Sequence, residues 1–319
     1  MITIKRDQIE QMPLLKNGAA AVRDAFVAVT DGRATVPPVG YLALAGKNAD
    51  CHIKFGYIDG DPMFVVKVAS GFYDNPAKGL PSSNGLMLAM SAETGETLAL
   101  LDDKGLLTDI RTGLGGAIAT RALARNDISV LGIVGAGTQA RFQIKALTAL
   151  YERPLRFVVW GRNTARAREF SNELSHEGLS VEATDDLQSL CLGADAIVTT
   201  TPSTTPLIRS EWVAAGTHIT AVGADAPGKQ ELDIALVARA DRLVSDLATQ
   251  SHGHGEFSHA SKADLLDPDR CVELGAILSG TGRGRMSASQ ITIADLTGLA
   301  TQDIAITRTV LEEIGLLGR

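Results

Sequence analysis

The sequence has few cysteines, few aromatic residues and no excess of positive charge. Its three cysteines, Cys51, Cys191 and Cys271, are odd in number and far apart, which indicates a reducing compartment without a disulfide framework or metal-ligand spacing. The formal net charge of -7 argues against nucleic acid or an anionic membrane as a partner. Apolar runs are too short for a membrane span, and the first residues lack a signal-peptide layout. We therefore expect a cytoplasmic protein with no metal, nucleic acid or membrane partner.

The overall composition is that of a soluble globular protein. Hydrophobic residues make up 45% and charged residues 21% of 319 positions. A chain of this length is expected to form two domains, each with its own core.

The first third of the chain predicts a helix followed by a mostly antiparallel sheet. Residues 8–31 carry apolar side chains near helical spacing, and Asp31-Gly32 closes this segment. Short alternating runs separated by Gly and Asp turns predict strands at 41–45, 52–57, 63–69, 85–91 and 97–102. A helix from about 108 to 124 leads into the next part of the chain.

The rest of the chain alternates between strand and helix patterns. Strands are predicted at 128–134, 156–160, 195–200, 217–222 and 242–246. Such alternation predicts an α/β fold with a doubly wound parallel sheet of the Rossmann type, beside an α+β domain. The polar segment 251–256 predicts a surface loop, and 304–317 a last helix.

The segment 128–140 is the most informative part of the sequence. An apolar strand ends in Gly135-Ala136-Gly137-Thr138-Gln139-Ala140, and a helical pattern follows at once. In this context the glycines allow a tight turn and a close approach of the backbone to a pyrophosphate, which the helix N-terminus binds. The motif predicts a site for a dinucleotide, NAD(H) or NADP(H).

The end of the second predicted parallel strand bears on the choice between these cofactors. An acidic residue there would bind the ribose of NAD, but the chain has Gly161-Arg162-Asn163, with Arg166 one turn on. Arginine can accommodate a 2′-phosphate, which favours NADP. The alternative is that Arg162 and Arg166 are solvated residues at a helix start.

Several motifs together resemble the ornithine cyclodeaminase/μ-crystallin family, nearly from end to end and in order. They are Phe64-Val-Val-Lys67, Gly79-Leu-Pro-Ser-Ser83-Asn84-Gly85, Thr94-Gly-Glu96, Leu107-Thr-Asp-Ile-Arg111-Thr112, the glycine turn, Gly223-Ala-Asp225-Ala-Pro-Gly-Lys229-Gln-Glu231-Leu-Asp233, and Asp295-Leu-Thr-Gly298-Leu-Ala-Thr-Gln-Asp303. The block from Lys67 to Arg111 is most similar to the branch of ectoine-utilisation cyclodeaminase-like proteins and iminosuccinate reductases.

The resemblance implies an amino-acid or imino-acid enzyme, a homodimer built through its first domain. That domain, 1–113 plus 304–319, would bind substrate, and 114–303 would bind NAD(P) facing a substrate pocket between the domains. The matching lysine, arginine and aspartate positions are Lys67, Arg111 and Asp225.

Physical chemistry gives each of these residues two interpretations. Lys67, at the end of an apolar run, either reaches solvent or points into a cleft, where a lowered pKa would let it relay a proton. Arg111, expected in the first turn of a helix, opposes the helix dipole, so we expect it to bind a substrate carboxylate. Thr112 either contacts the cofactor phosphate or packs.

Asp225 follows an apolar run at the carboxyl end of a predicted parallel strand, where ligands of such sheets collect. It serves either as a general acid/base or as a helix N-cap. Thr200, Thr201, Gly223 and Gly298 are expected to line the cofactor, although Gly298 also fits a plain turn.

One departure from the family concerns the substrate. Many members carry an arginine after a proline pair, whereas Pro37-Pro38 here is followed by Val-Gly-Tyr. His52 and Lys54 alternate with apolar residues and share one strand face, which either lines the pocket or faces solvent. Lining the pocket, they would suit a dicarboxylate, with Ser83 and Asn84 as neutral hydrogen-bonding groups.

These observations predict hydride transfer between NAD(P) and the α-carbon of a small imino or amino acid. The substrate expected from the branch is iminosuccinate, reduced to aspartate, with Arg111 orienting the carboxylate and Lys67 and Asp225 protonating the imine. The alternatives are a cyclodeaminase that releases ammonia with catalytic NAD, and a non-catalytic ligand-binding protein like μ-crystallin.

Overall fold

The computed structural model describes residues 1–318, except for the side chain of Pro268, and divides into two compact units. Unit 1 comprises Met1–Arg111 and the residues from Leu299 onward, and unit 2 comprises Thr112–Gly298. The chain leaves unit 1 inside helix α4 (Leu106–Leu123) and returns to it after Gly298. The roles predicted for domains 1–113 with 304–319 and 114–303 stay predictions.

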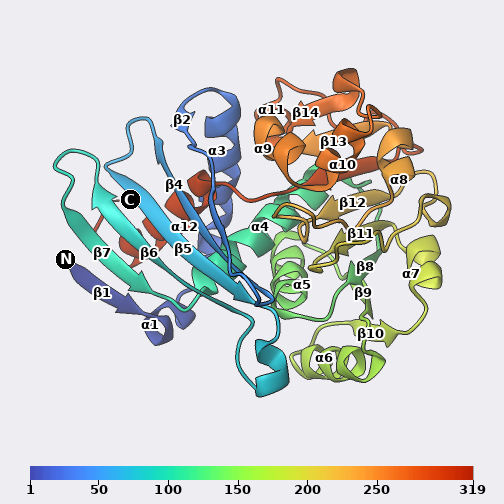
Figure 1. Cartoon of the computed structure of the whole chain (residues 1–319), viewed down its shortest axis with the longest axis horizontal. Coiled ribbons are helices and arrows are strands. Elements are labelled where there is room, and N and C mark those ends of the chain that lie inside the picture. Colours follow the sequence, from blue (N-terminus) through green and yellow to red (C-terminus); the bar gives the residue numbers. More distant parts are fainter. Residues whose placement is uncertain (319) are drawn as a thin grey trace. The chain divides into compact units, whose positions relative to one another are not determined.

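Unit 1 combines an antiparallel sheet with helices from both ends of the chain (Figure 1). Its strands are β1 (Ile2–Lys5), β2 (Ala34–Thr35), β3 (Gly40–Ala43), β4 (Ala49–Ile58), β5 (Met63–Phe72), β6 (Ser83–Ser91) and β7 (Thr97–Asp102). Its helices are α1 (Arg6–Glu10), α2 (Leu14–Asn17), α3 (Ala19–Thr30), the 3-10 turn η1 (Asn75–Lys78), the first residues of α4, and α12 (Ala300–Glu313).

The two faces of this sheet have different surroundings. In the order β1-β7-β6-β5-β4, strands β4 to β7 pair antiparallel and β1 joins β7 in parallel. One face, with Val65 and Lys67 on β5, packs against α12, which in turn packs against α3. Residues of the opposite face remain partly exposed, including Ile53 and Phe55 at 42% each. This alternation is the period-2 pattern that the sequence predicts.

The single helix predicted over 8–31 is wrong. The structure has three helices there, because Pro13 and Gly18 interrupt the apolar pattern at the junctions of α1, α2 and α3. Proline lacks the backbone donor and clashes with the preceding turn, so a continuous helix cannot pass through it. Only α3 keeps the expected amphipathic character, with Val22 and Phe26 buried.

Unit 2 is the Rossmann-type α/β unit. Its strands are β8 (Val130–Val134), β9 (Arg156–Trp160), β10 (Val181–Thr184), β11 (Ala196–Thr199), β12 (His218–Ala221), β13 (Arg242–Ser245), β14 (Cys271–Glu273) and β15 (Thr292–Asp295). Its helices are the rest of α4, α5 (Thr138–Leu150), α6 (Thr164–His176), α7 (Leu187–Gly193), η2 (Ser210–Trp212), α8 (Ile234–Arg239), α9 (Ala248–Gly253), α10 (Glu256–Lys262), η3 (Pro268–Arg270) and α11 (Leu274–Ser279).

The strands of unit 2 form one parallel sheet. Within the described residues their order is β10-β9-β8-β11-β12-β15-β13-β14, and each neighbouring pair is parallel. Strands β11, β12 and β15 are buried throughout, as is typical of the strands of a parallel sheet, and β12 and β15 include buried polar residues. The predicted fold class, a doubly wound parallel sheet with a second α+β unit, is confirmed.

The surface loop predicted at 251–256 is also wrong. Most of this segment lies in α9 and α10, and both Ser251 and Glu256 are buried. Glu256 accepts hydrogen bonds from the backbone N–H groups of Glu231 and Leu232 at 2.6 and 3.0 Å. Polar side chains can be buried when such partners satisfy them, and partners distant in sequence leave no local signal.

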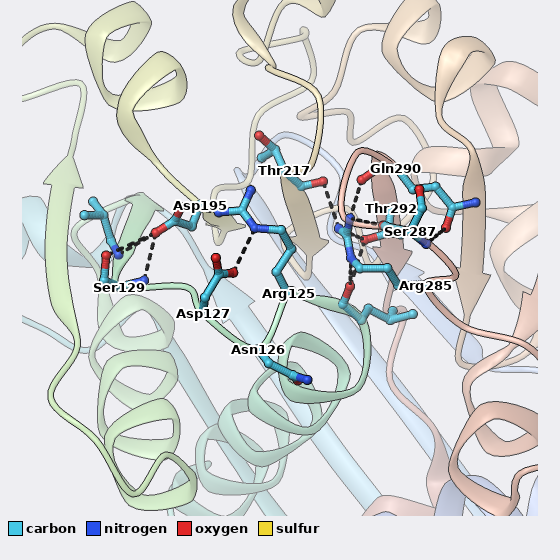
Figure 2. Close-up of polar contacts among 12 residues, drawn as sticks. Arg125, Asn126, Asp127, Ser129, Asp195, Thr217, Arg285, Ser287, Gln290 and Thr292 are labelled. Carbon is cyan, nitrogen blue, oxygen red and sulfur yellow. Dashed lines mark hydrogen bonds and ion pairs between the residues drawn. The ribbon is translucent and has the colours of Figure 1, made fainter.

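Two arginines brace the amino-terminal edge of the parallel sheet (Figure 2). Arg125 pairs with Asp195 at 2.7 Å, and Asp195 accepts from the Ser129 backbone N–H at 2.8 Å. Arg285 donates to the Leu123 carbonyl at 2.7 Å and to the Thr292 hydroxyl at 3.0 Å. These contacts occupy the edge opposite to the one where open α/β sheets bind ligands.

Among the described residues, no helix is both long and apolar enough to cross a membrane. The expected cytoplasmic location stays a prediction.

Candidate functional site

Lys67 lies on the covered face of the unit 1 sheet and is 1% exposed. Its Nζ atom lies 3.0 Å from Oδ1 and 2.8 Å from Oδ2 of Asp303, on the first turn of α12. The interpretation in which Lys67 reaches solvent is therefore wrong for this structure. A buried ammonium needs such a carboxylate, because desolvation alone would be too costly.

Arg111 meets the same carboxylate from α4. Its Nε lies 3.0 Å from Asp303 Oδ1, and its Nη1 donates to Gln302 Oε1 at 3.2 Å. The helix begins at Leu106, so Arg111 lies in its second turn rather than in the first turn that the sequence predicts. The argument from the helix dipole is weaker at that position, and Arg111 also has a structural partner.

The buried residue Asp303 was missing from the predicted set of site residues. Asp303 is 1% exposed and lies inside α12, which starts at Ala300, four residues before the predicted start at Ile304. One local signal could have found it. The run Thr301-Gln302-Asp303 places three polar residues directly before the apolar residues 304–306. Polar residues that are buried next to such a run need hydrogen-bond partners.

Burial of charge controls the protonation of this cluster. Burial, together with the charges of Arg111 and Lys54, lowers the pKa of Lys67 to about 7, against the opposing effect of Asp303. Burial likewise raises the pKa of Asp103 to about 6. The Oδ2 atom of Asp103 accepts from the Leu107 backbone N–H at 2.7 Å, while its Oδ1 has no hydrogen-bond partner within residues 1–318.

His52 and Lys54 lie on the same covered face, so their interpretation as a solvent-facing edge is wrong in this structure. Their exposures are 9% and 6%, and Lys54 is directly opposite Lys67 in the register of β4 and β5. His52 lies 3.5 Å from Asp50 and stacks edge-on with Tyr41.

Ser83 and Asn84 are at the start of β6, four and three positions before Met87, the residue paired with Lys67. The Asn84 side chain accepts from the Gly85 backbone N–H at 2.8 Å. Ser83 and Asn84 pair with Gly71 and Ser70, so they lie four and three positions beyond Lys67 along β5.

In unit 2 the glycine turn connects β8 to α5 as predicted. Gly135 has a φ of +120°, and a Cβ there would lie 2.4 Å from the Thr200 hydroxyl, so only glycine fits. A Cβ on Gly137 would meet no described heavy atom within 4 Å. Gly137 is the N-cap of α5 and, as a glycine, has no side chain with which to cap the first N–H groups of the helix, so this turn leaves room and N–H groups for a phosphate. Ala136 lies in the turn, and Thr138 and Gln139 begin α5.

The end of β9 is exposed and basic. Gly161 and Arg162 follow the strand, and the Asn163 side chain caps α6 by accepting from the Arg166 backbone N–H at 3.1 Å. Arg162 and Arg166 are exposed, as both the solvated interpretation and a 2′-phosphate contact require.

A buried carboxylate that sequence reasoning overlooked holds the loops after β11 and β12. Glu231 accepts from the Thr199 hydroxyl at 2.7 Å, from the Thr201 backbone and hydroxyl at 2.6 and 2.8 Å, and from the Gly223 backbone at 2.9 Å. Thr200 instead donates to the Val134 carbonyl at 3.2 Å. Burial raises the pKa of Glu231 to about 7, although the hydrogen bonds act in the other direction.

Asp225 follows β12 and pairs with Lys229 at 2.7 Å, with 43% of its side chain exposed. The next helix, α8, starts at Ile234 and is capped by Asp233, so Asp225 does not act as an N-cap. Gly298 forms a left-handed turn with φ +82°, and its N–H donates to the buried Asp246 at 2.6 Å. The Thr112 carbonyl accepts from Gln143 at 3.0 Å.

Among the described residues, no three His, Cys, Asp or Glu side chains are grouped as metal ligands.

Comparison with known proteins places these features in a family. A profile of the ornithine cyclodeaminase/mu-crystallin family matches residues 2–315. A putative dehydrogenase of Rhizobium meliloti is 42% identical over 298 residues, covering 92% of this chain and 90% of its own. An alanine dehydrogenase of Archaeoglobus fulgidus is 36% identical, covering 98% of this chain and 94% of its own. An iminosuccinate reductase of Paracoccus denitrificans is 33% identical, covering 98% and 96%.

Two solved structures share the fold along nearly the whole chain. A Thermococcus litoralis Δ1-pyrroline-2-carboxylate reductase in complex with NADH and L-proline superposes with a TM-score of 0.92 at 28% identity, covering 98% of this chain and 97% of that one. An archaeal alanine dehydrogenase dimer with bound NAD superposes with a TM-score of 0.89 at 32% identity, covering 99% and 97%. The expected class, a nicotinamide-dependent oxidoreductase acting on C–N bonds, is confirmed. The chain belongs to the ornithine cyclodeaminase/mu-crystallin family.

Proposed function

We propose that the protein is an NAD(P)H-dependent imine reductase whose substrate is iminosuccinate, which it reduces to aspartate. The observation that carries this proposal is the buried cationic group of unit 1. Lys54, Lys67 and Arg111 are each at most 6% exposed, and Lys67 and Arg111 share the carboxylate of Asp303. Lysine and arginine side chains gathered in a buried site are typical of a pocket for an anionic ligand, and a dicarboxylate offers two groups to such side chains.

The cations have different tasks in this scheme. Arg111 binds one carboxylate through its planar guanidinium, and Lys54 binds the second as a point charge. Lys67, with a pKa of about 7, holds a proton for the imine nitrogen near neutral pH. Asp225 of unit 2 serves as a second acid/base group. A bound nicotinamide would supply the hydride, and a protonated imine accepts hydride more readily because its carbon is more electrophilic.

The cofactor would be held by the glycine turn, the first residues of α5, and the loops that Glu231 and Asp246 brace. That set comprises Gly135, Ala136, Gly137, Thr138, Gln139, Thr200, Thr201, Gly223 and Gly298, with Thr112 as a further contact. The exposed Arg162 and Arg166 favour NADPH, because they can pair with a 2′-phosphate and no carboxylate follows β9 within the described loop. The solved relatives named above bind NADH and NAD, so both cofactors must be tested.

The uncovered face of the unit 1 sheet supports a homodimer. Its side chains are apolar on four adjacent strands, and they are Ile53, Phe55, Phe64, Val66, Val68, Leu86, Leu88, Met90, Leu98 and Leu100. An apolar surface of this kind on one sheet face is typical of a protein interface. We propose a second copy of this chain as its occupant, and the archaeal relative described above is a dimer.

The test is the absorbance at 340 nm of NADH or NADPH, in parallel, with pure protein, oxaloacetate and excess ammonia, which form iminosuccinate in solution. We expect rapid cofactor oxidation that needs both oxaloacetate and ammonia. Cofactor oxidation with pyruvate and ammonia but not with oxaloacetate and ammonia would show that the substrate is an imine with one carboxylate rather than two. No oxidation with any imine, together with ammonia release from L-ornithine and catalytic NAD, would make the protein a cyclodeaminase.

A further inference from the structure

We propose that Asp303 is a positioning residue whose single carboxylate holds the Lys67 ammonium and the Arg111 guanidinium in the arrangement that catalysis requires. The inference rests on the proposed function in one respect, namely that Lys67 and Arg111 act on the substrate. The contacts themselves lie within unit 1 and hold for any substrate.

The geometry is that of one anion shared by two cations. Lys67 Nζ donates a hydrogen bond to Oδ1 at 3.0 Å and forms an ion pair with Oδ2 at 2.8 Å, and Arg111 Nε forms an ion pair with Oδ1 at 3.0 Å. The exposed fractions of these side chains are 2%, 6% and 1% for Lys67, Arg111 and Asp303. Water is therefore excluded, and the charges interact at a low effective dielectric.

Asp303 contacts both Lys67 and Arg111. Lys67 and Arg111 repel each other, and the charge of Arg111 lowers the pKa of Lys67. A carboxylate in contact with both cations attracts each of them, which offsets their repulsion and holds the three side chains together. Removing this carboxylate would leave both buried cations without the charge that they share, and the loss of one partner from a buried ion pair strongly destabilises a protein.

The start of α12 holds the carboxylate in place. Asp303 lies in the first turn of this helix, where the helix dipole stabilises a negative charge. The neighbouring Gln302 accepts from the Leu299 backbone N–H at 3.0 Å and from Arg111 at 3.2 Å. The same turn therefore contacts Arg111 through Asp303 and Gln302 and contacts Lys67 through both oxygens of Asp303, so a shift of α12 would move both cations together.

The charge of Asp303 also controls the proton on Lys67. The charged groups that interact with Lys67 come from four elements: Arg111 on α4, Lys54 on β4, Asp103 on the connection from β7 to α4, and Asp303 on α12. Arg111 and Lys54 lower the pKa of Lys67, and Asp303 raises it. Without the Asp303 charge, the pKa of Lys67 would fall below its present value of about 7 and the amine would be neutral at neutral pH.

The experiment compares Asp303→Asn, Asp303→Glu and the control Asp61→Asn in the full-length protein. Asp61 is a suitable control because it is also buried and also pairs with α12, through Arg308 at 3.3 Å, but it does not contact Lys67 or Arg111. We expect Asp303→Asn to lower kcat/KM on the order of 100-fold. Its activity should fall with rising pH at least about one unit earlier than in the wild type. Asp303→Glu should recover part of the loss, and Asp61→Asn should lose stability but keep the pH profile.

A readout without substrate separates this inference from the proposed function. The ¹⁵N NMR titration of the Lys67 side chain, assigned with Lys67→Met, should show a lower pKa in Asp303→Asn than in the wild type. A shifted NMR pKa in a protein that reduces no imine would contradict the proposed function and support the positioning role.

Two results would overturn the inference. One is a folded Asp303→Asn variant with an unchanged Lys67 pKa and a kcat/KM within about threefold of the wild type. Should that variant not fold, Asp303→Glu decides the question, because it keeps the charge and moves it by one methylene. Wild-type kcat/KM and a wild-type Lys67 pKa in Asp303→Glu would then exclude a positional requirement.

Discussion

At the scale of single residues, the chemistry of unit 1 depends on how many charges are buried together. The buried charged residues of this unit include Lys54, Lys67, Arg111, Asp103 and Asp303. The shared face of His52 and Lys54 was predicted because alternation along a strand can be read locally, whereas Lys67 and Arg111 were predicted as site residues from the resemblance to the family. The sequence did not predict Asp303, because the contact between Lys67 and Asp303 joins positions 236 residues apart.

Lys54 should determine the preference for a second carboxylate. We expect Lys54→Met to raise KM for iminosuccinate by about 10- to 100-fold, because a buried charged contact is lost. Reduction of the imine of pyruvate, which has one carboxylate, should change little. The ratio of kcat/KM for the two imines measures this effect, and an equal loss with both substrates would contradict the assignment of Lys54.

The pH dependence of reduction should follow the proton on Lys67. The protonated form is the donor, so kcat/KM should be highest below about pH 7 and fall as the pH rises through the pKa of Lys67, about 7. Lys54→Met should move this decline to higher pH, because Lys54 lowers the pKa of Lys67. Steady-state rates from pH 5.5 to 9 test both statements. A decline unaffected by Lys54→Met would assign the titration to another group.

At the scale of elements, the sequence predicted best those strands that apolar runs and turns delimit. Strands β7 and β9 have the predicted limits, whereas β1, β2, β10, β14 and β15 were not predicted. The helix predicted over 8–31 failed because its apolar period hides the break at Pro13. The loop predicted at 251–256 failed because Ser251 and Glu256 find buried partners far along the chain. Local pattern cannot show such partners.

The glycine turn allows a prediction that separates folding from cofactor binding. Gly135→Ala should destabilise the free protein by about 1–3 kcal/mol, because its Cβ would overlap the Thr200 hydroxyl at a positive φ. Gly137→Ala should destabilise the free protein less, since no described atom lies within 4 Å of its Cβ and only the preference of the N-cap for glycine over alanine is lost. It should nevertheless weaken NADH binding, because the methyl group occupies the approach of the pyrophosphate.

Thermal unfolding of the free protein and fluorescence titration with NADH give the two quantities. If Gly137→Ala bound NADH as tightly as the wild type, the phosphate site would have to lie elsewhere.

At the scale of the whole molecule, the proposed dimer makes the uncovered sheet face of unit 1 an interface. Phe55→Asp should dissociate the dimer, because a charge on this face would be buried without a partner. Leu192→Asp in unit 2 is the matched control, since Leu192 is similarly exposed at 55% against 42% for Phe55. Analytical ultracentrifugation should give twice the chain mass for the wild type and the control. A dimeric Phe55→Asp variant would place the interface on another surface.

The division into units also has a consequence for synthesis of the protein. Unit 1 is made of two separate parts of the chain, and α12, the part that carries Asp303, comes after the whole of unit 2. At translation speeds of about 5–20 residues per second, Lys67 precedes its counter-charge by roughly 10–50 s. During that time a closed unit 1 would contain Lys67 and Arg111 without the carboxylate that they share. We therefore expect that on the ribosome unit 2 folds first and that unit 1 closes only when α12 emerges.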